Sequence, residues 1–195
     1  MGSEGKSRVL AKVFSFDVKF VGARRTAFYR KLFGFSSRVE RVNKDGSTKI
    51  HTYATPGLLD EIPHAKLGKS VIAVPKAAAA KLRSFFSNPR WQPMELHAFD
   101  AILPPDVRLR AMEAALNRTI RVGPKQSAKL ADEIGELTAF LEHPPEPEVV
   151  ERINRALRAA DELMRLDWSD DLEFSRMLEA KLAPLRKGQQ TPGIS

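Results

Sequence analysis

Three residues that can exchange protons lie within five positions of one another, in the first third of the chain. Asp60, Glu61 and His64 belong to the segment Leu-Asp-Glu-Ile-Pro-His at residues 59–64. Two carboxylates and an imidazole in one loop could act as acid and base, or hold a metal ion that assists hydrolysis. Side chains of these types also commonly pin a loop through hydrogen bonds to its own backbone. The segment is therefore a candidate hydrolytic centre whose alternative role is structural.

Outside this segment, the sequence contains no familiar catalytic motif. No glycine-rich stretch has the spacing that cradles phosphate ahead of a Lys-Ser or Lys-Thr pair, and no serine lies in a nucleophile elbow. The four histidines, at positions 51, 64, 97 and 143, show no i, i+4 pair, and there is no cysteine to supply a thiolate ligand. We therefore expect no cofactor and no metal. The sequence leaves open whether the protein is an enzyme.

A second set of residues is suited to binding phosphate. Ten lysines and arginines lie between residues 24 and 69: Arg24, Arg25, Arg30, Lys31, Arg38, Arg41, Lys44, Lys49, Lys66 and Lys69. Exposed cations bind the phosphates of DNA or RNA without reading the base sequence. The cluster predicts a nucleic-acid-binding surface, and its alternative is an ordinary solvated face. Arg25 is expected to be structural, because at helical spacing it lies between Phe28 and Tyr29 on the apolar side.

The distribution of charge favours the same surface. The formal net charge of the chain is +8. Residues 1–90 contain 18 basic and 6 acidic residues, for a net charge of +12, whereas residues 91–195 contain 14 basic and 18 acidic residues, for −4. A field this uneven attracts polyanions to one end of a molecule. Phosphate contacts are unspecific, so the pattern does not distinguish DNA from RNA.

Strands and helices alternate in the first half and must position these residues. Phe14, Phe16, Val18 and Phe20 recur with a period of two, which is typical of a half-buried strand. The remaining elements are expected as a helix at 23–33, strands at 37–42 and 48–53 around an Asp-Gly turn, a loop at 55–69, a strand at 70–74, a helix at 76–87 and a strand at 94–102. This order predicts an α+β domain over residues 8–103, with an antiparallel or mixed sheet and two helices on one face.

After Pro104 the sequence becomes helical and acidic. The spacing of apolar residues predicts helices over residues 106–122, 124–142, 147–166 and 169–185. Short breaks between them favour antiparallel packing in a domain over residues 104–187, followed by a flexible tail at 188–195. A pair of helices buries only one apolar seam. We therefore expect the remaining apolar stripes to pack on the sheet, to form a homodimer or to bind a protein partner.

The composition favours a soluble protein of the cytoplasm. No stretch approaches the roughly eighteen apolar residues of a membrane span, and the first residues lack the apolar core of a signal peptide. The absence of cysteine agrees with a reducing compartment, and we expect no membrane association. Asparagine and glutamine are scarce, with four of each, which is typical of proteins from thermophiles.

Three functions remain open on these observations. The first is a non-enzymatic nucleic-acid-binding protein that uses the helix at 23–33 and the hairpin at 37–53. The second is a metal-assisted or acid–base hydrolase that acts on a phosphorylated or nucleic-acid substrate at Asp60, Glu61 and His64. The third is a scaffold whose C-terminal helices bind another protein. We prefer the first, because no catalytic motif is present.

Overall fold

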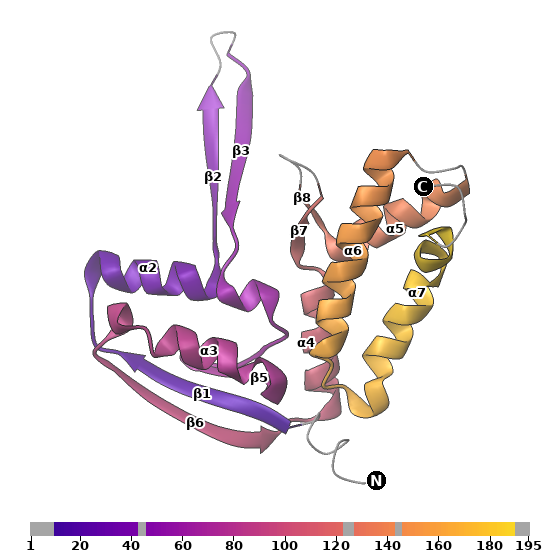
Figure 1. Ribbon diagram of the computed structural model, residues 1–195. Coiled ribbons are helices and arrows are strands. Elements are labelled where there is room, and N and C mark those ends of the chain that lie inside the picture. The colour runs from indigo at the N-terminus through magenta and orange to yellow at the C-terminus, as the bar shows by residue number, and fades with distance from the viewer. Residues whose placement is uncertain (1–9, 43–45, 123–126, 143–145, 190–195) are drawn as a thin grey trace.

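The computed structural model describes residues 10–42, 46–122, 127–142 and 146–189. Within them, an N-terminal antiparallel sheet with two helices is followed by a helical region, so the predicted α+β class is confirmed (Figure 1). The helical region stands beside one end of the sheet. None of the described helices combines the length and apolar character needed to span a membrane.

Among the described residues, the main sheet has four strands, and every neighbouring pair is antiparallel. In spatial order they are β4 (Ala65–Gly68), β5 (Val71–Pro75), β1 (Leu10–Val18) and β6 (Met94–Ile102). The central strand β1 pairs with β6 along its whole length. The strand predicted from the period-two phenylalanines is thus the central one, and β6 is a long edge strand that, among described residues, pairs only with β1.

Two helices cover one face of this sheet. They are α2 (Gly22–Phe33) and α3 (Ala79–Phe86), with the short 3-10 turns η2 (Lys76–Ala78) and η3 (Pro89–Trp91) before and after α3. Phe14, Phe16 and Val18 of β1 are buried against them. Ala11 and Val13 alternate with these residues and therefore face the other side of the sheet, where they join the core of the helical region. The N-terminal half thus contributes to two cores.

A hairpin stands apart from the main sheet. It consists of β2 (Phe35–Val42) and β3 (Thr48–Thr55), which pair only with each other and project from the end of α2 (Figure 1). We call this hairpin the arm. Gly46 has a φ of 81°, as the predicted Asp-Gly turn requires, and residues 43–45 lie outside the described residues. The order of elements had not revealed that the hairpin would leave the sheet.

The segment predicted as a loop at 55–69 is more regular than expected. It contains the 3-10 turn η1 (Leu58–Glu61) and the edge strand β4. Leu59 and Ile62 anchor the turn because both are buried in the core beneath α2 and α3. β4 exists because it pairs with β5, and that pairing has no signal in a stretch rich in proline and glycine.

The helical region begins after Leu103. Its helices are α4 (Pro105–Leu116), α5 (Leu130–Ala139), α6 (Pro147–Arg165) and α7 (Glu173–Gln189), with the 3-10 turns η4 (Phe140–Glu142) and η5 (Asp170–Leu172). The last two predicted helices are confirmed. The predictions at 106–122 and 124–142 are wrong at their junction, where β7 (Thr119–Arg121) and β8 (Ser127–Lys129) form a second hairpin. The β-branched residues Thr119 and Ile120 favour a strand there.

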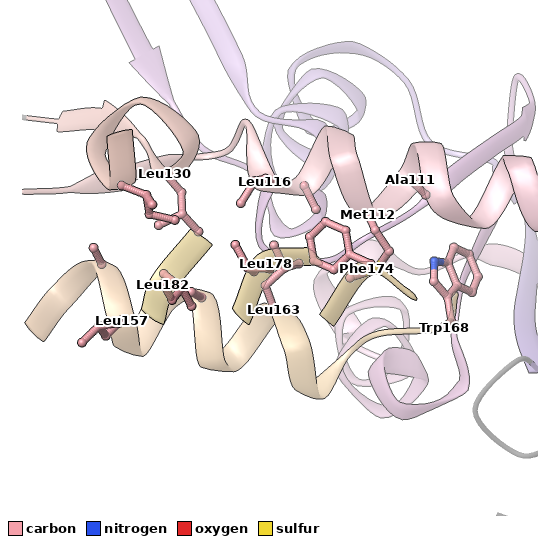
Figure 2. Close-up of a cluster of buried hydrophobic side chains, with 14 of the residues drawn as sticks. Ala111, Met112, Leu116, Leu130, Leu157, Leu163, Trp168, Phe174, Leu178 and Leu182 are labelled. Carbon is pink, nitrogen blue, oxygen red and sulfur yellow. The ribbon is translucent and has the colours of Figure 1, made fainter. Parts of the chain in front are cut away.

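All four helices meet in one core. Figure 2 shows Met112 and Leu116 of α4 beside Leu163 of α6 and Leu178 of α7. The apolar stripes that suggested a homodimer or a protein partner are buried in this core, together with Ala11, Val13 and Ala73 of the sheet. Most of the apolar stripes are therefore covered within the chain, whereas Phe140 and Met177 are 51% and 36% exposed.

Candidate nucleic-acid interface

Both faces of the arm are open to solvent. Every residue of β2 is exposed except Ser37, which is half-buried. Large aliphatic side chains of both strands are exposed: Val42 of β2 has 73% and Ile50 of β3 has 56% of full exposure. An isolated two-stranded hairpin buries little apolar surface of its own. Its exposed residues are therefore available to a partner.

The arm carries the basic residues predicted there. Arg38 and Arg41 are exposed, and being three apart on a strand they lie on opposite faces. Arg41 is paired with Lys49 in the register of the two strands. Lys44 and the side chain of Lys49 lie outside the described residues. The side chains of Arg38 and Arg41 therefore extend from opposite faces of the arm.

The base of the arm is held by η1. The Gly57 N–H, at the start of this turn, donates to Asp60 Oδ2 at 2.7 Å. On the other strand, Gly34 has a φ of 78°, a conformation that favours glycine, and its N–H donates to the Arg30 carbonyl at 2.9 Å. One bond thus caps the end of α2, just before β2 begins, and the other caps the start of η1, just after β3 ends.

One side of α2 carries Arg25, Tyr29 and Phe33 at four-residue intervals, and Lys66 of β4 extends this row of cations and rings. The Arg25 guanidinium lies 5.9 Å from the centre of the Tyr29 ring, and Lys66 Nζ lies 4.5 Å from the centre of the Phe33 ring. Between them, the Tyr29 and Phe33 rings stack with centres 6.1 Å apart and planes 11° apart. Arg25 is exposed, and it contacts the Tyr29 ring from the outside of the apolar face.

The structural arginine of this helix is Arg24. Its Nε donates to the Arg90 carbonyl at 2.6 Å, its Nη2 donates to the Gln92 carbonyl, and its guanidinium lies 4.7 Å from the centre of the Phe20 ring. Arg24 thus ties the start of α2 to the segment after α3. At the other end of α2, the Arg30 guanidinium lies 4.0 Å from the centre of the Phe35 ring.

The described cations of α2, the arm and residues 66–69 have no acidic partner among the residues that the structure describes. Between described residues, no ion pair with a carboxylate is formed by Arg24, Arg25, Arg30, Lys31, Arg38, Arg41, Lys66 or Lys69. Elsewhere in the same half, Lys12, Lys19 and Lys81 each pair with an acid. Residues 22–55 contain eight basic and two acidic residues, a net charge of +6. The positive charge of this region is therefore uncompensated.

The proton-exchanging residues of the loop are used to hold it. Asp60 accepts from Gly57 as described, Glu61 forms an ion pair with Lys81, and His64 Nδ1 lies 2.9 Å from the Ile62 carbonyl oxygen. In the described part of the chain, no three His, Asp or Glu side chains are grouped so that they could hold a metal ion. These contacts agree with the structural role considered for the segment.

A cleft of about 850 Å³ lies at the root of the arm. Its walls are the end of α2 with the arm on one side, and α4 with the second hairpin on the other; η1 and the residues after it form its floor. Residues that represent these parts are Phe33, Phe35, Ser36, Thr55, Asp60, His64, Ala114, Asn117, Thr119 and Ser127. The cleft therefore joins the basic arm to the helical region, which the sequence did not predict.

Arg118 also lines the cleft. It donates from Nη2 to the Ala159 carbonyl of α6 at 2.6 Å and from Nη1 to the Glu61 carbonyl of η1 at 3.3 Å. Burial lowers the pKa of Arg118, while the charges of Glu162 and Glu61 act in the opposite direction. Its two backbone bonds make Arg118 a link between the arm's base and the helical region.

Sequence reasoning placed the basic residues but missed the rings beside them. The interval of four between Arg25, Tyr29 and Phe33 is visible in the sequence and marks one side of a helix. Phe35 and Lys66 carry no such signal, because their contacts with Arg30 and Phe33 depend on how the arm and β4 leave the body. No protein-family model, curated protein or solved structure matches the chain.

Proposed function

We propose that the protein binds nucleic acid with the arm and the adjoining side of α2. The observation that carries the proposal is the positive net charge of residues 22–55, which is shared between α2 and the hairpin that projects from the body (Figure 1). A surface with unpaired cations attracts a polyanion and gains affinity from the counterions it releases. In the same half of the chain, Lys12, Lys19 and Lys81 do form ion pairs with acidic residues.

The form of the arm favours insertion into a groove. The major groove of B-form DNA admits a two-stranded β-ribbon. Arg38 and Arg41 lie on the same edge strand, β2, so their long side chains would reach the phosphates that border this edge of the ribbon. Val42 and Ile50, near the tip, would then contact base edges or sugars rather than phosphates.

The row on α2 supplies a second contact region. Arg25 and Lys66 hold their charges over the rings of Tyr29 and Phe33, which limits their freedom without neutralising them. Lys31 is exposed on the same helix. Contacts of these residues with phosphate would position the protein without reading sequence. We therefore expect affinity for nucleic acid with little dependence on base sequence.

The test is a fluorescence-anisotropy titration of the full chain with labelled duplex and single-stranded oligonucleotides at several salt concentrations. For Arg38→Ala/Arg41→Ala, we expect weaker binding. Loss of two phosphate contacts should lower the slope of log affinity against log salt by about 1.8 for a duplex and about 1.4 for a single strand. Circular dichroism checks that the variant remains folded.

The matched control is Arg158→Ala/Arg176→Ala. Both arginines are exposed on the helical region, so the variant loses the same charge at a distance from the arm. We expect the control to keep the wild-type salt slope. Equal losses in the two variants would mean that only the overall charge matters, and absence of salt-dependent binding by the wild type would refute the proposal.

A further inference from the structure

The cleft at the root of the arm has the size of a ligand site. It encloses about 850 Å³, within the range of roughly 300–1,000 Å³ that is typical of small-molecule pockets. Its lining includes Phe35 and Ser36 of the arm and Ala114 and Thr119 of the helical region. A nucleic acid held by the arm would therefore pass directly beside it.

A partly exposed ring lies in the wall of this cleft. Phe35 is the first residue of β2, and 38% of its surface is exposed. The Arg30 guanidinium lies 4.0 Å from the ring centre, so a positive charge lies against this ring. Aromatic rings flanked by cations are the groups on which proteins stack the bases of single-stranded nucleic acids.

Polar atoms that could bond a base edge belong to the cleft lining. Among described residues, the Asp60 carboxylate uses one oxygen to accept from Gly57, which leaves the other for a ligand. His64 Nδ1 faces the Ile62 carbonyl, so in the neutral ring Nδ1 carries the proton and Nε2 is an acceptor. Asn117 donates from Nδ2 to the Glu113 carbonyl, which leaves its side-chain oxygen. Acceptors of this kind complement the amino and imino groups of an unpaired base.

We propose that this cleft receives an unpaired base, stacked on Phe35, with the flanking phosphates near Arg30 and Lys66. The inference rests on the proposed nucleic-acid binding and deepens it, because it makes single-stranded or overhanging nucleic acid the preferred ligand. A base inside an intact duplex is paired and stacked, and reaching the cleft would require its extrusion from the helix. A free strand end has no such requirement.

The experiment compares the full chain with two probes, a blunt duplex and the same duplex extended by a single-stranded end that contains 2-aminopurine, each made as DNA and as RNA. We expect the extended probe to bind about tenfold more tightly, since stacking of one base contributes on this scale. Its 2-aminopurine fluorescence should fall on binding. Phe35→Ala should remove both the preference for the extended probe and the fluorescence change.

Three further variants make the result decisive. Phe35→Tyr keeps a ring and should keep the preference. Phe99→Ala removes a ring of 52% exposure on β6, outside the cleft, and should change nothing. Ala114→Trp fills the cleft from the opposite wall and should remove the preference with the arm intact, so the test holds even where Phe35→Ala fails to fold.

The outcomes separate the two proposals. Salt-dependent binding of both probes with equal affinity, or a preference that survives in folded Phe35→Ala and Ala114→Trp, overturns the cleft as a base site while the arm remains the binding element. Absence of salt-dependent binding to either probe overturns the proposed function itself. A preference found with DNA alone, or with RNA alone, supports the cleft and identifies its ligand.

Discussion

The backbone nitrogen of Gly34 lies where a side chain at Gly57 would begin. A Cβ atom on Gly57 would be 2.0 Å from that nitrogen and 2.6 Å from the carbonyl carbon of Phe33. β2 begins one residue after Gly34, and β3 ends two residues before Gly57. This backbone contact therefore closes the base of the arm and sets its direction relative to α2.

Gly57→Ala should be severely destabilising. The methyl group would meet backbone atoms, which cannot rotate away, so α2 and η1 must separate. We expect a loss of about 3 kcal/mol or more in the free energy of unfolding, measured by urea denaturation. If the variant unfolds as cooperatively as the wild type and at nearly the same urea concentration, the contact is not required.

Gly135→Ala is the matched control. Gly135 lies exposed in α5, and a Cβ atom there would meet nothing within 4 Å. Alanine has a higher helix propensity than glycine, so we expect a gain of up to about 1 kcal/mol. The two substitutions make the same chemical change and should have opposite signs.

Arg24 and Lys31 should separate folding from binding. Arg24→Ala removes a hydrogen bond to the Arg90 carbonyl and the contact with the Phe20 ring, and we expect a cost of about 1 kcal/mol. Lys31→Ala should change stability by less than about 0.5 kcal/mol, because its side chain is exposed. The check is to measure the melting temperature of each variant and its affinity for an oligonucleotide. Equal melting temperatures of the two variants would contradict the prediction.

Arg152 neutralises a fully buried carboxylate. Glu133 has no exposed surface, and both of its oxygens accept from Arg152 at 2.9 Å. These bonds, with a third to Glu136, raise the pKa of Arg152. Arg152→Leu leaves the Glu133 charge buried without a partner and should cost about 3–5 kcal/mol. Arg110→Leu, which breaks an exposed pair with Asp106, should cost less than about 1 kcal/mol by the same denaturation.

Asp100 should contribute to stability above acidic pH. The hydrogen bond from Lys12, at 2.9 Å, is the largest cause that lowers the pKa of Asp100, and the charge of Lys76 acts in the same direction. A carboxyl with a lowered pKa in the folded state stabilises the fold above its unfolded pKa, and this contribution is lost as the pH falls through its folded pKa. The melting temperatures of wild type and Asp100→Asn should therefore differ at neutral pH and converge below about pH 4. A constant difference down to strongly acidic pH would contradict this.

Local pattern in the sequence was sufficient for much of the fold. Alternation at Phe14, Phe16 and Val18 specified the central strand, because one face of a strand repeats every second residue. The Asp-Gly turn specified the hairpin, and continuous apolar spacing specified α6. The basic residues that form the candidate interface were also visible, since charge is a property of the sequence itself.

Only the tertiary structure decided which faces and charges are free. Arg24 and Arg25 are neighbours with the same side chain, yet Arg24 bonds to carbonyls of residues 66 and 68 positions away, whereas Arg25 lies over its own helix. The separation of the arm from the sheet, the strand β4 and the cleft likewise depend on segments far apart in the chain. The spacing of apolar residues indicates which face of a helix or strand is buried. The element that covers this face is set by long-range packing, which local sequence does not encode.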